Sequence, residues 1–184
     1  MKSIDEMLDA VAKNLHTAPP ENKSVKTKKN PKITVSESGN KAKIEPVPCY
    51  DKLTLNLAKE ISYAVERAAE QLGVNAVIAL CDDGANLILL HAMEDSYIAS
   101  IKVSQDKAYT AVALKMSTDA ALRESRGGAL DGLTNGNGIM LLGGGEPLSS
   151  NGKIFGGIGV SGGTKEQDIV LSKLGAEYFR ARIK

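Results

Sequence analysis

A glycine-rich segment near the end of the 184-residue chain has the sequence GGIGVSGGTKEQD and occupies residues 156–168. A strand predicted over residues 153–160 runs into it. Thr164 and Gln167 then form a capping box, which predicts a final helix from Thr164 to about residue 181. Fourteen of the 18 glycines lie between Gly127 and Gly163, so glycine is strongly concentrated in this part of the chain.

Residues 157–162 match the dinucleotide-binding pattern G-x-G-x-x-G between a strand and a helix. That fingerprint also requires a second parallel strand after the helix and an acidic residue about 20 positions further on. The chain ends at Lys184, so we expect neither. A smaller role stays open, because the helix start at Gly162, Gly163 and Thr164 would offer N–H groups to a carboxylate or propionate. The alternative is an ordinary helix start.

A second dense glycine cluster lies in the sequence LGGGEP, residues 142–147. Without Cβ atoms, Gly144 and Gly145 would let a flat ligand or a neighbouring chain approach the backbone. The alternative is a bulge followed by a turn. No Gly-Lys-Ser/Thr pattern occurs, which argues against a nucleoside triphosphate.

The other predicted elements follow an order typical of an α+β fold. Helices are expected over 54–72, ended by Gly73, and over 96–115, with a short helix from Thr118. Two apolar runs, 76–81 and 87–92, predict a β-hairpin.

On the helix over 96–115, the side expected to be buried carries Ile98, Ile101, Ala108, Ala111, Val112 and Met116. A further strand is expected over 139–142. Together the elements predict an α/β sandwich, in which an antiparallel sheet of about five strands is flanked by helices. We expect this domain to span residues 49–184.

The segment before the domain divides into two parts. Residues 1–18 place apolar side chains at helical spacing, which predicts an amphipathic helix. The residues of this stripe that we expect to mediate targeting are Ile4, Met7, Leu8, Val11 and Leu15. Residues 19–48 are rich in lysine and proline and predict a disordered basic linker. The helix is expected to dock on a partner, and the alternatives are that it folds back on the domain or dimerises.

Composition excludes several classes of function. The net charge of +1 argues against general nucleic-acid binding, and no apolar run is long enough to cross a membrane. The two cysteines are too few for a disulfide scaffold and fit a cytoplasmic location. We expect no signal peptide.

Few side chains could supply chemistry. His91 ends a predicted strand and His16 lies near the N-terminus, so neither has a second ligand at zinc-site spacing. A lone imidazole could be an axial haem ligand, and the alternative is a strand-end histidine with a satisfied hydrogen bond. Cys81 lies beside two aspartates and is a poor candidate nucleophile. Lys107, in the middle of a helix, is expected on a solvated face unless it points into a cleft.

Three segments, 106–111, 143–145 and 156–168, resemble the GlcG/HbpS family, including PduO-type C-terminal domains. The resemblance covers about residues 53–181. It implies a profilin-like α/β domain, assembly into homo-oligomers, and haem as cofactor. The candidate binding residues are His91, Lys107, Gly144, Gly145, Gly157, Ser161, Gly162 and Gly163. Members of the family share no single axial ligand, and His91 is the candidate in this chain. Ala92 stands where the family stretch has arginine, which weakens an expected contact to an anion.

The N-terminal helix and linker resemble the encapsulation peptides of bacterial microcompartment cargo. The first functional hypothesis is therefore a haem- or tetrapyrrole-binding accessory protein. We expect it to bind a cofactor without acting as an enzyme. It would be targeted by residues 1–18 to shell proteins or to a co-encapsulated enzyme in a propanediol-type compartment. The alternatives are an enzyme or binder for a small carboxylate, flavin or corrinoid, and a purely structural oligomerising module. The adenosyltransferase domain of full-length PduO is not expected, so cobalamin adenosylation is not expected either.

Overall fold

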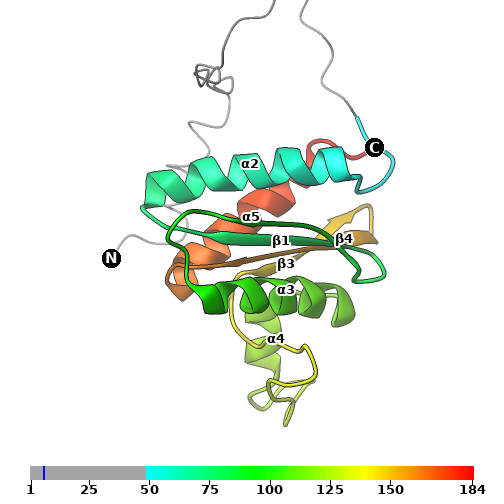
Figure 1. Ribbon diagram of the computed structural model, residues 1–184. Coiled ribbons are helices and arrows are strands. Elements are labelled where there is room, and N and C mark those ends of the chain that lie inside the picture. The colour runs from blue at the N-terminus through cyan, green and yellow to red at the C-terminus, as the bar shows by residue number, and fades with distance from the viewer. Residues whose placement is uncertain (1–5, 7–48) are drawn as a thin grey trace, which may run out of the picture.

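A computed structural model describes Glu6 and residues 49–184 of the chain. Its elements are α2 (Leu55–Leu72), β1 (Val77–Asp82), β2 (Leu87–Ala92), α3 (Ile98–Ala113), α4 (Thr118–Glu124), β3 (Gly145–Ser150), β4 (Lys153–Ser161) and α5 (Lys165–Arg180). The strands form one antiparallel sheet in the order β2-β1-β4-β3. Helices α2 and α5 cover one face of the sheet and α3 covers the other (Figure 1). The α+β sandwich is therefore confirmed. Apart from Glu6, the helix over 1–18 and the linker over 19–48 lie outside the described residues.

The described sheet has four strands where about five were expected. The strand expected over 139–142 is absent, and β3 (Gly145–Ser150) is a strand that was not predicted. Ile139 makes only an isolated bridge with Gly136. The next two backbone N–H groups donate to side chains instead of to a strand: Met140 to Thr110 Oγ1 at 2.8 Å and Leu141 to Asn135 Oδ1 at 2.6 Å. Apolar composition alone suggested a strand here, but these hydrogen bonds satisfy the backbone without one.

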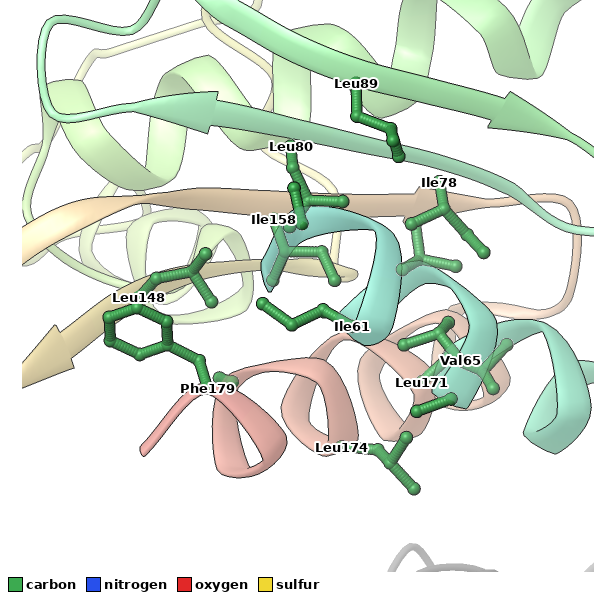
Figure 2. Packing of buried hydrophobic residues seen from close by; sticks show 14 of the residues in the cluster. Ile61, Val65, Ile78, Leu80, Leu89, Leu148, Ile158, Leu171, Leu174 and Phe179 are labelled. Atoms are coloured by element: carbon green, nitrogen blue, oxygen red, sulfur yellow. The ribbon is translucent and has the colours of Figure 1, made fainter. Parts of the chain in front are cut away.

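The face of the sheet toward α2 and α5 holds the main hydrophobic core. Ile78 and Leu80 of β1 and Ile158 of β4 are fully buried there. Figure 2 shows them packed against Ile61 of α2 and Phe179 of α5. Large branched side chains fill this layer, as the period-2 pattern of the strands predicts.

On the opposite face, β4 presents glycines to helix α3. A Cβ atom added to Gly159 of β4 would lie 2.0 Å from the backbone oxygen of Ser104, and one added to Gly157 would lie 2.5 Å from that of Ala108. Helix α3 therefore rests directly on the backbone of β4, in a position that only glycine allows.

Ala108, Ala111 and Val112 of α3 are buried as expected, but the first turns of the helix differ from the prediction. Ser100 and Ser104 are buried, whereas Ile98 is 86% exposed and Ile101 is 38% exposed. The prediction that both isoleucines face the core was wrong. Small side chains must face a glycine surface, so the long apolar ones lie on the outer side of the helix.

The ends of the helices follow the local signals in the sequence. Thr54 caps α2, and Gly73 ends it in the left-handed region with φ 64°. Thr164 and Gln167 form the expected capping box at the start of α5. No helix within residues 49–184 combines the length and hydrophobicity needed to cross a bilayer.

Candidate functional site

Lys107 lies in the protein interior and not on a solvated face. Its side chain is fully buried, and its Nζ donates to the Val160 backbone oxygen and to Asp168 Oδ2, both at 2.7 Å. Burial lowers the pKa of Lys107 and raises that of Asp168, and the attraction between the two groups opposes both shifts. This ion pair ties α3, β4 and α5 together.

Gly144 and Gly145 face the same interior region. At Gly144, where φ is 111°, an added Cβ would lie 2.9 Å from Lys107 Nζ. At Gly145 it would lie 2.5 Å from Thr118 Cγ2 and 2.6 Å from the Lys107 backbone oxygen. The absent Cβ atoms therefore make room for the protein's own lysine and helices, and Gly145 begins strand β3 where a bulge and turn was the alternative expected.

Gly157 and Ser161 lie beneath α3 on the same face of the sheet. Gly157 contacts the backbone of Ala108, and Ser161 Oγ donates to Ser100 Oγ at 3.1 Å. Both positions are largely enclosed by protein atoms.

Gly162, Gly163 and Thr164 form the turn before α5, and the N–H groups of Gly163 and Thr164 are already bonded within the protein. Gly163 N donates to Asp168 Oδ1 at 2.9 Å, and Thr164 N donates to Gln167 Oε1 at 2.9 Å. A shallow pocket of about 370 Å³ lies beside this turn and includes Tyr97 in its lining. Because the capping groups occupy these donors, the helix start does not present them to an external anion.

His91 lies on the other face of the sheet, near the end of β2. Its Nδ1 is 2.5 Å from Glu66 Oε1 and 3.0 Å from Ser62 Oγ, both on α2. The ring of Tyr63, 56% exposed, lies 5.7 Å away between centroids at an interplanar angle of 58°. The His91 side chain is 30% exposed, and within residues 49–184 its Nε2 has no hydrogen-bond partner.

The expected binding residues therefore do not form a single site. In the sheet, His91 pairs with Ile78, which packs in the core toward α2 and α5. Gly157 and Gly145, in contrast, face α3. The sheet separates the histidine from the glycines, so the two sets belong to different surfaces.

Three neighbours of His91 were missed from the sequence: Ser62, Tyr63 and Glu66. The available signal was the i, i+4 spacing of Ser62 and Glu66, two polar residues that share one side of an otherwise apolar helix face. Their proximity to His91 depends on how α2 packs on β2, which the local pattern does not contain.

Within the described part of the chain, no three His, Cys, Asp or Glu side chains are grouped so that they could hold a metal ion. A metal bound at His91 would therefore need ligands other than these side chains. The iron of a tetrapyrrole meets this condition, because the ring itself supplies its other ligands.

Comparisons with known proteins agree on the family. Residues 53–177 match the family model described as haem degrading protein HbpS-like. A 15.0 kDa protein encoded in the dhaT-dhaS intergenic region of Citrobacter freundii is 40% identical over 130 residues, which are 69% of this chain and 92% of that protein. The corrinoid adenosyltransferase PduO of the same organism is 32% identical over 67% of this chain but only 38% of its own length.

Solved structures give the same result. The Klebsiella pneumoniae protein ORFY is similar with a TM-score of 0.66 and 33% identity, over 78% of this chain and 97% of that one. The structure of a PduOC:heme complex is similar with a TM-score of 0.65 and 29% identity, over 69% and 94% of the two chains. The family model covers most of the chain and the sequence relatives cover the same domain, so this chain belongs to the HbpS-like family.

Proposed function

We propose that the protein binds haem or a closely related tetrapyrrole and that His91 supplies the ligand to the iron. The observation that carries this proposal is the half-buried imidazole whose Nδ1 is held by Glu66 while its Nε2 is unengaged. The related PduOC structure is described as a haem complex, which supports the same class of ligand.

The residues around His91 fit such a group. A neutral imidazole is a common iron ligand, and the exposed ring of Tyr63 beside it offers a flat apolar surface to a planar macrocycle. The iron would supply one-electron or small-ligand chemistry when bound. The side chains of this surface would hold and orient the macrocycle.

The His91 cluster favours binding over catalysis. A nucleophile–base relay needs the nucleophile on one ring nitrogen and the carboxylate on the other. Here Ser62 and Glu66 both contact Nδ1, so the hydroxyl cannot transfer a proton to a carboxylate-supported base. We therefore propose a cofactor-binding accessory role.

Titration of the full-length protein with haemin, followed at the Soret band, tests the proposal. We expect saturable binding by the wild type and by the His16→Ala variant, which is the matched control because it removes the other histidine. The His91→Ala variant should lose the saturable spectral shift. Absence of saturation in the wild type, or equal spectra for wild type and His91→Ala, would contradict the assignment. Parallel titrations with a flavin and a corrinoid test the alternative ligands.

We further propose that residues 1–18 recruit the protein into a bacterial microcompartment, through shell proteins or a co-encapsulated enzyme. The support is the apolar stripe in the sequence, the lysine- and proline-rich segment behind it, and the match to PduO. A full-length fusion to a fluorescent reporter should form puncta in compartment-producing cells, and a Leu8→Asp variant should be diffuse. A diffuse wild-type signal would refute the targeting role.

We also propose that the domain forms homo-oligomers. Tyr97 is 72% exposed and Ile98 is 86% exposed at the start of α3, an unusual position for large apolar side chains on an isolated surface. Light scattering after size exclusion should give a mass above that of one chain, and an Ile98→Glu variant should lower it. A monomeric wild type would refute this assembly.

A further inference from the structure

We infer that Glu66 is the residue that orients His91: it fixes the proton on Nδ1 and leaves the Nε2 lone pair as the outward donor atom. The inference rests on the proposed function, because it assigns the atom through which His91 would bind iron. Glu66 itself is a positioning residue and touches no ligand.

The short contact between the two side chains determines the tautomer. Nδ1 of His91 lies 2.5 Å from Oε1 of Glu66, closer than an ordinary N–H···O bond. Two unprotonated atoms could not approach so closely, because their lone pairs repel. An ionised carboxylate only accepts hydrogen bonds, so the proton belongs to Nδ1, and a neutral ring then has its free lone pair on Nε2.

Ser62 fixes the carboxylate in turn. Its side chain is fully buried one helical turn before Glu66, and its Oγ donates to Glu66 Oε1 at 3.1 Å. The same Oγ lies 3.0 Å from His91 Nδ1, so serine, glutamate and imidazole form a closed triangle. Such a buried anchor reduces the freedom of both partners to rotate away from each other.

This arrangement is the one that proteins use behind metal-bound histidines. A carboxylate on the far nitrogen sets the tautomer, fixes the ring orientation and increases the basicity of the donor nitrogen. For His91 the consequence is a stronger and better directed Nε2 donor than a solvent-exposed histidine would offer.

The first test needs no ligand. Long-range ¹H–¹⁵N correlation spectra of the full-length protein, recorded near pH 8, distinguish the two neutral tautomers of a histidine ring. We expect His91 to be Nδ1–H in the wild type and in Glu70→Gln. Glu70 lies one turn further along α2 and is exposed, so that control removes the same charge from the same helix. In Glu66→Leu and Glu66→Gln the Nε2–H form should become populated. A wild-type ring in the Nε2–H form, or no change in the Glu66 variants, would overturn the inference.

The second test uses haemin. Loss of a carboxylate behind a metal ligand usually reduces affinity about 10- to 100-fold, so Glu66→Gln should bind haemin that much more weakly. The reduction potential of the bound iron should rise, because a less basic imidazole stabilises the ferric state less. Glu70→Gln should match the wild type in both measurements. Equal affinity and potential in Glu66→Gln would overturn the tuning role even if haemin binds through His91. Absence of haemin binding together with the expected tautomer would refute the proposed function and not the role of Glu66.

Discussion

Substituting Gly159 by alanine is the most direct test of how α3 is held on the sheet. The new Cβ would lie 2.0 Å from the Ser104 backbone oxygen and 2.6 Å from the Ala108 backbone nitrogen, where ordinary contacts begin at 3.4 Å. Because both neighbours are backbone atoms of one helix, no side-chain rotation relieves the clash. Helix α3 must move by about 1.4 Å, the difference between 3.4 and 2.0 Å.

That displacement would move a helix that Lys107 already ties to β4 and α5. It would stretch the 2.7 Å bonds that Lys107 makes to Val160 and Asp168. Overpacking a well-filled interior usually costs about 1–3 kcal/mol and sometimes more, and we expect the upper end here, about 3 kcal/mol. For a domain of this size the melting temperature should then fall by roughly 10 °C.

Thermal and urea unfolding followed by far-UV circular dichroism measure the effect. Gly152→Ala is the matched control: Gly152 has φ 77° and no atom within 4 Å of an added Cβ, so alanine there meets backbone strain without a clash. That strain should cost only about 1 kcal/mol. If Gly159→Ala were no less stable than Gly152→Ala, the proposed contact between α3 and β4 would be refuted.

Three further predictions concern buried polar groups. Burial raises the pKa of Glu146 to about 7 from 4.5, so the folded state binds a proton on Glu146 more tightly than the unfolded state does. The stability that this protonated carboxyl contributes is therefore lost as the pH rises from 4.5 to 7. Urea unfolding at several pH values should show that the free energy of unfolding of Glu146→Gln, relative to that of the wild type, increases by up to about 3 kcal/mol between pH 4.5 and 7. The same pH dependence in both proteins would contradict the prediction. Burial also raises the pKa of Cys81 to about 11, so a thiol reagent at neutral pH should label the exposed Cys49 quickly and Cys81 only after unfolding. Two fast thiols would be inconsistent with this. Replacing Lys107 by Met leaves Asp168 buried without its cation and should lower the free energy of unfolding by about 3–5 kcal/mol, while adding Asp168→Asn should recover part of that loss. A double variant no more stable than Lys107→Met would exclude the unpaired charge as the cause.

The parts of the fold that could be predicted depend on interactions within a few residues. Thr54 and Gly73 mark the limits of α2, and the capping box of Thr164 and Gln167 marks the start of α5. Each signal is a hydrogen bond or a backbone conformation set by its immediate neighbours, so it is visible in a short window of sequence.

The exposure of Ile98 and Ile101 in the first turns of α3 could not be predicted in this way. Apolar periodicity assigns Ile98 and Ile101 to the core, because large aliphatic side chains usually fill it. Here the surface beneath the helix is the glycine backbone of β4, and only Ser100, Ser104 and similar small residues fit against it. The deciding information lies some 55 residues away along the chain.

The candidate site shows the same limitation. His91 could be singled out because the described domain has one histidine, but its partners Ser62 and Glu66 lie 29 and 25 residues away and meet it only when α2 packs on β2. Lys107 was noticed for its position in a family-like segment. Its burial follows from a pairing with Asp168 across 61 residues.

The glycine-rich segment that carries the family resemblance is, in the structure, a surface for packing a helix. Gly157 and Gly159 allow α3 to rest on β4, and Gly163 bonds back to Asp168. A chain can keep all of these features while its ligand changes, because Gly157 and Gly159 face α3 and the N–H of Gly163 is bonded to Asp168. Fold and ligand specificity are therefore separable in this protein. A family match through this segment is stronger evidence for the fold than for the identity of the ligand. The side of the sheet with His91, Glu66 and Tyr63 is where substitutions should change ligand binding without unfolding the domain.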